Sequence, residues 1–168
     1  MKLLSTGIVA LVASSAAVSA LKMSPEGLDM LKGFEGFRNH YYRDSAGNWT
    51  IGYGHNCDKS KCANIHEPLF EPDARNILAG DVGGAEHCVN TNTPNLKQHQ
   101  FDALVSFTYN LGCHGYTGSK LMEFVKNKNW KAAAGDFVHY DHSGGKEVPG
   151  LKTRRLKESA HFCSMGGC

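Results

Sequence analysis

The chain has 168 residues, enough for one domain or for two small lobes around a shared element. Its formal net charge is +2 at pH 7, which is too close to neutral to indicate nucleic acid as a partner. Beyond residues 1–20 no segment is long and apolar enough to span a bilayer, so we expect no stable membrane association.

The opening segment, MKLLSTGIVALVASSAAVSA, has the pattern of a secretory signal peptide over residues 1–20. Lys2 supplies a positive n-region, a weakly apolar stretch follows, and Val18-Ser19-Ala20 is a small-residue cleavage signal. Cleavage after Ala20 would leave residues 21–168 as a secreted protein. The alternative is a retained signal anchor, although its Ser, Gly and Ala content makes it a poor permanent span.

All six cysteines lie beyond this segment, at Cys57, Cys62, Cys88, Cys113, Cys163 and Cys168. An even number in a secreted chain indicates disulfides, and we favour two short loops, Cys57–Cys62 and Cys163–Cys168, which leaves Cys88–Cys113. The alternative is a zinc site, because His55, Cys57, Cys62 and His66 cluster in the sequence. That order is not a familiar zinc spacing, and an oxidising compartment favours disulfides. We therefore expect no metal and no other cofactor.

The first element predicted in chain order is a helix in SPEGLDMLKGFEGF. Ser24 is a candidate N-cap and Pro25 suits the first helical position. Gly33 and Gly36 weaken the helix toward its end, so we expect Glu35 in its last turn or just past it.

The next segment, YYRDSAGNWTIGYG, predicts a β-hairpin. Aromatic and β-branched residues lie on both sides of a Ser-Ala-Gly-Asn turn. Asp44 ends the first strand and Thr50 lies early in the second. A helix followed by this hairpin brings Glu35, Asp44 and Thr50 within reach of one another.

The rest of the chain predicts helices separated by short breaks. Residues 71–89 are expected to form one helix that packing must hold, because its glycines lower the helix propensity. Further helices are expected over 96–112, 119–129, 129–140 and 151–162, with Gly112, Ser119 and Asn129 as caps. One helix and a small sheet in the first half, followed by a helical bundle, indicate an α+β fold.

A basic stretch, GGKEVPGLKTRRLKE, lies near the C-terminus. It carries Lys146, Lys152, Arg154, Arg155 and Lys157 against two glutamates. A basic surface suited to an anionic partner and an ordinary solvated helix face are equally good interpretations.

The opening helix and hairpin hold the residue types that glycoside hydrolysis needs. An acid must protonate the leaving oxygen, and a carboxylate must activate water or hold developing charge. Glu35 is flanked by Phe34, Phe37 and glycines, surroundings that would keep a carboxyl group protonated. Asp44 adjoins a polar turn and is better placed to stay ionised, and Thr50 offers a hydroxyl that can hold a water. A Glu and an Asp at this separation are, by themselves, usually solvated surface groups.

The whole segment GFEGFRNHYYRDSAGNWTIGYGH is far more specific, and it resembles the N-terminal lobe of the bacteriophage-type lysozymes, glycoside hydrolase family 24. The family pattern appears here as Glu35-Gly36, Tyr42-Arg43-Asp44 and Thr50-Ile51-Gly52-Tyr53-Gly54-His55. The resemblance continues in QFDALVSFTYNLG, in Ser119 and in GGK…GLKTRRLKE, and it covers nearly all of the chain after residue 20.

This resemblance implies a lysozyme-like two-lobed fold in a single catalytic domain, residues 21–168. The N-lobe would span about 21–70, the connecting helix about 71–89 and the mainly helical C-lobe about 90–168, with the substrate cleft between the lobes. A monomer is the default expectation.

The resemblance also implies Glu35 as general acid, with Asp44 and Thr50 positioning the attacking water. The bond cut in that family is the β-1,4 link between N-acetylmuramic acid and N-acetylglucosamine in peptidoglycan, with inversion. The family's sugar contacts map here to Asn56, Tyr109, Asn110 and Ser119. His55 is expected to anchor the hairpin rather than to act in catalysis.

Two other functions fit the resemblance: a non-catalytic binder of peptidoglycan or chitin-type polymers, and an enzyme acting on chitin. The presence of all three catalytic positions favours an enzyme. The cysteines and the signal suggest a member adapted to life outside the cell, and His139-Tyr140 stands where many members carry Trp. Asn48-Trp49-Thr50 is a glycosylation sequon, which we interpret as a coincidence because a glycan there would obstruct the site.

Overall fold

The computed structural model describes residues 20–44, 46–58 and 62–168. In chain order its elements are α1 (Pro25–Glu35), β1 (Arg38–Arg43), β2 (Trp49–Gly52), β3 (His55–Asn56), α2 (Glu71–Asp81), α3 (Gly83–Asn92), α4 (Gln98–Thr117), α5 (Lys120–Lys126), α6 (Trp130–Asp136), the 3-10 helix η2 (Phe137–Tyr140), β4 (His142–Ser143), β5 (Lys146–Glu147), α7 (Pro149–Phe162) and the 3-10 helix η3 (Ser164–Gly166). Apart from Ala20, the expected signal peptide lies outside these described residues.

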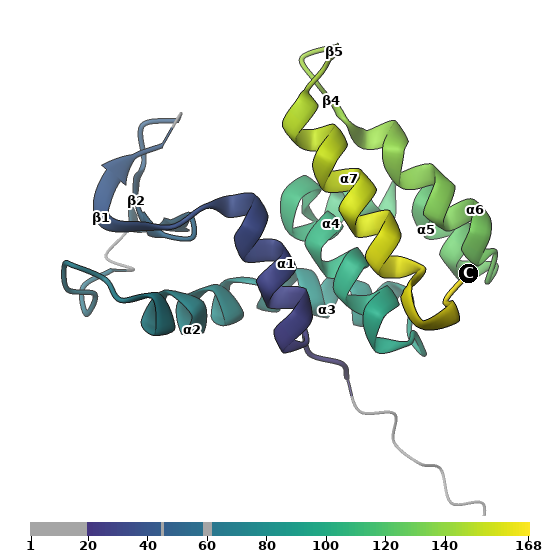
Figure 1. The fold of residues 1–168 in the computed structure, drawn as a ribbon, viewed down its shortest axis with the longest axis horizontal. Helices are drawn as coiled ribbons and strands as arrows, with labels where there is room; N and C mark the ends of the chain where they lie inside the picture. Colours follow the sequence, from purple (N-terminus) through teal and green to yellow (C-terminus); the bar gives the residue numbers. More distant parts are fainter. Residues whose placement is uncertain (1–19, 45, 59–61) are drawn as a thin grey trace, which may run out of the picture.

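The elements divide into a sheet-bearing end and a helical end. Figure 1 shows β1, β2 and α2 at one end, α4, α5, α6 and α7 at the other, and α1 between them. This arrangement confirms the predicted α+β class. Within the described part of the chain, no helix is long and apolar enough to cross a membrane.

The predicted hairpin is confirmed, and a third strand extends it. Strands β1, β2 and β3 form an antiparallel sheet in that order. Thr50 lies opposite Tyr42 on one side and Asn56 on the other, so it occupies the central strand. The sequence did not predict β3, which is only two residues long.

Helix α1 begins and ends where the sequence predicted. Ser24 accepts a hydrogen bond from the Gly27 amide, Pro25 takes the first position, and Glu35 is the last residue. The start of α1 is fixed to α4 by Asp102, which accepts from the Ser24 amide (3.0 Å) and the Ser24 hydroxyl (2.6 Å). A Cβ at Gly27 would lie 2.7 Å from Asp102 Cγ, so this close approach requires glycine.

The single helix predicted over residues 71–89 is wrong: the chain forms α2 and α3, which meet at Val82. Gly80, Gly83 and Gly84 surround the break, and their low helix propensity weakens the continuation. Val82 itself is fully buried, so packing determines the direction in which α3 leaves. Helix α3 also runs beyond the predicted end, to Asn92.

Gly112 was predicted to end the helix that begins near residue 96, and the structure bears this out only in part. Its φ of 76° and ψ of 161° interrupt α4, a conformation that glycine adopts readily. Helical turns then resume and continue to Thr117. The predicted caps Ser119 and Asn129 are confirmed, since each side chain accepts from a backbone amide of the helix it precedes.

Aromatic side chains fill the helical end. The ring of Phe107 in α4 meets Phe137 (5.6 Å between centroids) and Tyr140 (5.0 Å) edge-on. Phe137 in turn contacts Phe162 of α7 at 5.7 Å. These contacts, edge-to-face for Phe107 and tilted for Phe137 with Phe162, add to the free energy gained by burial and connect α7 to α4 through Phe137.

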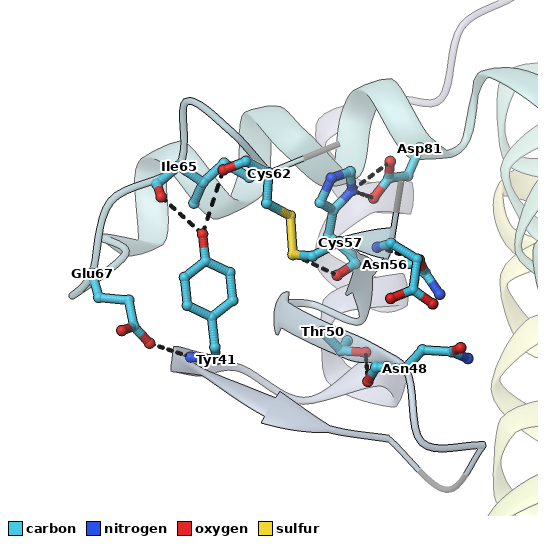
Figure 2. The surroundings of a disulfide bond; sticks show 11 residues. Tyr41, Asn48, Thr50, Asn56, Cys57, Cys62, Ile65, Glu67 and Asp81 are labelled. Atoms are coloured by element: carbon cyan, nitrogen blue, oxygen red, sulfur yellow. Dashed lines mark hydrogen bonds and ion pairs between the residues drawn. A yellow bond between two sulfur atoms is a disulfide. The ribbon is translucent and has the colours of Figure 1, made fainter. Parts of the chain in front are cut away.

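All six cysteines are paired as predicted: Cys57–Cys62, Cys88–Cys113 and Cys163–Cys168. The first bridge closes a loop beside the sheet, where Figure 2 shows it next to Tyr41. The second joins α3 to α4, and the third fixes the C-terminus. With Cys57 and Cys62 bonded to each other, the alternative zinc site would lack its thiolates.

Asp102 should make stability depend on pH. Burial opposes its charge, but the nearby His161 ring (Nε2 to Oδ2 3.6 Å) and hydrogen bonds from Ser24 and Gln98 outweigh this effect and hold its pKa below 3.8. A lowered folded-state pKa contributes stability above the unfolded pKa, and that contribution is lost as pH falls through the folded value. Asp102→Asn should therefore cost about 1–3 kcal/mol at neutral pH, and the deficit should shrink as the pH falls below about 4.

Urea denaturation from pH 6 to pH 2 measures the Asp102 effect. Asp73→Asn, at an exposed position of α2, is the control and should show no such convergence. A deficit for Asp102→Asn that stays constant over the whole range would contradict the linkage.

The three disulfides should differ in their contribution to stability. The residues of Cys88–Cys113 are 25 apart, against 5 for Cys57–Cys62 and Cys163–Cys168. Chain entropy then predicts that replacing the long-range pair by serine costs about 1–1.5 kcal/mol more than replacing either short pair. Melting temperatures of the three double-serine variants test the order, and equal losses would speak against it.

Candidate active site

Glu35 lies where α1 ends and the chain turns toward the sheet. The next residue, Gly36, has a φ of 71°, which glycine tolerates and which directs the chain into β1. The Glu35 side chain is 23 % exposed, and its Oε1 accepts a hydrogen bond of 2.8 Å from Arg154 Nη1. Its nearest charged partner is thus a cation, whereas the sequence predicted apolar surroundings.

The phenylalanines beside Glu35 have other contacts. Phe37 is 41 % exposed, with its ring 5.3 Å from that of Tyr53. The ring of Phe34 lies under the guanidinium of Arg154, 4.8 Å from centroid to carbon. Phe34 therefore supports the cation that holds Glu35.

Arg154 connects three helices through one planar group. Besides Glu35 on α1, its Nε donates to Glu158 Oε1 of α7 (3.0 Å) and its Nη2 to the Ser106 carbonyl of α4 (3.0 Å). Both Arg154 and Glu158 are buried. The carboxylates offset the cost of removing the guanidinium from water.

Arg155 and Glu158 complete a buried ionic cluster. Arg155 Nε lies 3.0 Å from Glu158 Oε2, and the Ser106 hydroxyl donates to Glu158 Oε1 at 2.6 Å. Burial raises the pKa of Glu158 and lowers the pKa of Arg155 to about 10, while the attraction between the opposite charges opposes both shifts. Arg155 Nη2 also donates to Asn110 Oδ1 at 2.9 Å.

This cluster corrects the interpretation of the basic stretch. Arg154 and Arg155 are 5 % and 0 % exposed, so they belong neither to a basic surface nor to a solvated helix face. Lys146, Lys152 and Lys157 are exposed, as expected. The spacing of Arg154 and Glu158 at i, i+4 was the available signal, but exposed helix faces carry the same spacing.

Asp44 is held by the turn that follows β1. Its Oδ1 accepts from the amides of Ala46 (2.9 Å) and Asn48 (2.8 Å), and its Oδ2 from Asn48 Nδ2 (3.2 Å). Led by the bond from the Asn48 amide, these contacts hold the pKa of Asp44 below 3.8. The turn thus keeps Asp44 ionised, as the sequence predicted.

Thr50 is buried in the central strand, and Asn48 links it to Asp44. The Thr50 hydroxyl donates to the Asn48 carbonyl at 3.1 Å (Figure 2). The Thr50 hydroxyl proton is therefore engaged in this hydrogen bond, while the lone pairs of its oxygen can accept a hydrogen bond from another donor. The predicted turn ended at Asn48, but no role in the site was expected of this residue, although an Asp and an Asn that enclose a Gly-containing turn are a recognisable signal.

A pocket of about 550 Å³ opens between the sheet and α4. It is lined by Gly54, His55, Asn56, Asp81 and Tyr109. His55 Nδ1 lies 2.8 Å from Asp81 Oδ2, which ties β3 to the end of α2, as expected of an anchoring histidine. Burial, with smaller effects from Asp81 and Glu35, raises the pKa of Tyr109 to about 12, so Tyr109 remains a neutral phenol.

The four predicted sugar contacts differ in their surroundings. Asn56 and Tyr109 line the pocket together. Asn110 is exposed, with its side-chain oxygen bonded to Arg155. Ser119 is only 4 % exposed, and its hydroxyl donates to the Tyr116 carbonyl while accepting from the Met122 amide. All four assignments stay predictions, and the bonds of Ser119 describe a helix cap.

Comparison with known proteins identifies a protein family that this chain matches. The family model described as "Phage lysozyme" matches residues 32–158. An endolysin of Bacillus phage B103 is 34% identical over 145 residues, 84% of this chain but 54% of that protein, so the chain spans about half of that relative's length. A SAR-endolysin of Haemophilus phage HP1 is 31% identical over 154 residues, 83% of this chain and 80% of that protein.

A solved structure confirms the lysozyme-like character of the fold. The crystal structure of a P22 lysozyme mutant matches with a TM-score of 0.77 at 30% sequence identity. The match covers 86% of this chain and 99% of the other.

Asp44 should titrate below its ordinary value. Carbon-13 NMR of its carboxyl group should give a midpoint under 3.8, because three hydrogen bonds stabilise the charged form. Asn48→Ala should raise the midpoint only in part, since the Nδ2 donor is lost but the backbone donors remain. Asn127→Ala, at the end of α5, is the control and should change nothing. A native midpoint at or above 3.8 would refute the prediction.

Proposed function

Because the chain belongs to the phage lysozyme family, we propose that it hydrolyses bacterial peptidoglycan. The observation that carries this proposal is the combination of Glu35 at the end of α1 with an ionised Asp44 and the buried Thr50 hydroxyl on the adjoining hairpin. The family match over residues 32–158 includes all three. The bond cut would be the β-1,4 link between N-acetylmuramic acid and N-acetylglucosamine.

Glu35 would act as the general acid that protonates the leaving oxygen. In the free protein its carboxylate is paired with Arg154. A saccharide that covers the cleft would displace water from this partly exposed group and so favour its protonated form. Arg154 would then hold Glu35 in place while the proton passes to the glycosidic oxygen.

Asp44 and Thr50 would position the water that attacks the sugar. A water can donate one hydrogen to the Asp44 carboxylate and the other to the Thr50 oxygen, whose own proton is bonded to Asn48. Direct attack by this water inverts the configuration at the anomeric carbon, which requires carboxyl groups roughly 6.5–9.5 Å apart. Proton NMR of the first anomer released would distinguish inversion from retention.

The sugar chain would lie along the pocket between the sheet and α4. Tyr109 offers an aromatic face for stacking, and Asn56 an amide that can bond to polar groups of the sugar. For Asn110 and Ser119 a sugar contact rests on the family resemblance alone. The catalytic domain would comprise residues 21–168, acting as a monomer.

The protein would act outside the cytoplasm. Three disulfides favour an oxidising compartment. Residues 1–20 would serve as a cleaved secretory signal. A retained signal anchor, with release to the periplasm, is the second possibility, and the name of the Haemophilus phage relative, a SAR-endolysin, agrees with it.

Mass spectrometry of digested peptidoglycan tests the activity and the acid together. The native protein should release muropeptides with reducing N-acetylmuramic acid ends. Glu35→Gln should lose about 10²–10⁴-fold in rate, because it cannot donate the proton. Glu123→Gln, on the exposed face of α5, is the matched control and should digest like the native protein.

Each outcome has a defined meaning. More than a few per cent of native activity in a folded Glu35→Gln would exclude Glu35 as the acid. Tight binding to cell walls without any products would make the protein a lysozyme-like binder. Products from chitin but not from peptidoglycan would keep the enzyme and change its polymer.

A further inference from the structure

Glu158 has no part in the proposed chemistry, yet it shares a guanidinium with Glu35. Arg154 Nε bonds to Glu158 and Arg154 Nη1 to Glu35. We propose that Glu158 is a positioning residue for Glu35, acting through Arg154: it fixes the orientation of the guanidinium and takes up part of its charge. The inference rests on the proposed role of Glu35 as the general acid.

The orientation of Arg154 is determined by contacts on different edges of its guanidinium. Glu158 holds Nε, Ser106 holds Nη2, and only Nη1 reaches the partly exposed Glu35. A planar group bonded in this way cannot rotate without losing one of its bonds. Glu158 is itself immobilised, because it is 0 % exposed and accepts from the Ser106 hydroxyl.

The charges of the cluster balance in pairs. Two guanidiniums, Arg154 and Arg155, face two carboxylates, Glu35 and Glu158. From α4 the cluster is met by the uncharged groups of Ser106 and Asn110 and by the neutral phenol of Tyr109. The ammonium of Lys157 lies outside it, 5.8 Å from the Phe34 ring. Loss of the charge on Glu158 would leave Arg154 to act more strongly on Glu35. The stronger positive charge would favour the ionised form of Glu35, whereas a general acid must carry a proton.

Glu158→Gln tests this, because it removes the charge and keeps the shape. The titration midpoint of Glu35, measured by carbon-13 NMR, should fall by about one pH unit. The alkaline limb of the kcat–pH profile should move down by the same amount, which lowers kcat on that limb about tenfold. KM should not change, because the fully buried Glu158 cannot touch substrate. Glu158→Asp restores the charge and should return the midpoint toward the native value.

Glu86→Gln is the matched control. Glu86 is a buried carboxylate on α3 that bonds to the exposed Lys22 and to the Met23 amide, so its loss removes a buried charge without involving Arg154. It should leave the Glu35 midpoint and the pH profile unchanged. If Glu158→Gln does not fold, Ser106→Ala removes the hydroxyl that stabilises Glu158, and it should shift the midpoint in the same direction by a smaller amount.

An unchanged Glu35 midpoint in folded Glu158→Gln, or an equal shift in Glu86→Gln, would overturn the inference. The NMR measurement needs no turnover. A native protein that releases no muropeptides would therefore refute the proposed function, while the midpoints would still decide whether Glu158 acts on Glu35.

Discussion

The ion pair between Arg154 and Glu35 joins the last long helix to the first across 119 residues of sequence. A guanidinium is costly to bury unless carboxylates and hydrogen-bond acceptors surround it. Helix α7 can therefore pack against α1 and α4 only where Glu158, Ser106 and Glu35 all meet Arg154. The position of the candidate acid follows from this packing requirement as much as from the end of α1.

The other half of the site has a local origin. Asp44 and Thr50 are both bonded to Asn48, so the turn between β1 and β2 suffices to fix their relation. The two halves of the site should therefore respond differently to substitutions elsewhere in the protein. Substitutions in the helical end would disturb Glu35 through Arg154, whereas Asp44 would keep its hydrogen bonds as long as the turn is intact.

This difference also explains what could be predicted from the sequence. The Ser24 cap, the hairpin and the short-loop disulfides depend on neighbouring residues, and all were predicted correctly. The burial of Arg154 and Arg155 depends on α4 and α1, which no local pattern identifies. The break at Val82 is an intermediate case, because the glycines around it signalled a weak helix but only burial of Val82 placed the break.

Helix α2 determines the position of the sheet relative to the helical end. At its start Glu71 accepts from the Tyr53 hydroxyl (2.8 Å) and pairs with Lys32 (2.7 Å), and at its end Asp81 holds His55. The sheet is therefore bonded to both ends of α2, whereas Tyr109 on the opposite wall of the pocket belongs to α4. The width of the pocket then depends on the angle at which α2 meets α3 at Val82. Under the proposed function, two determinants would therefore be separate: the Val82 junction would govern access of the polymer, and the Arg154 cluster would govern the proton on Glu35.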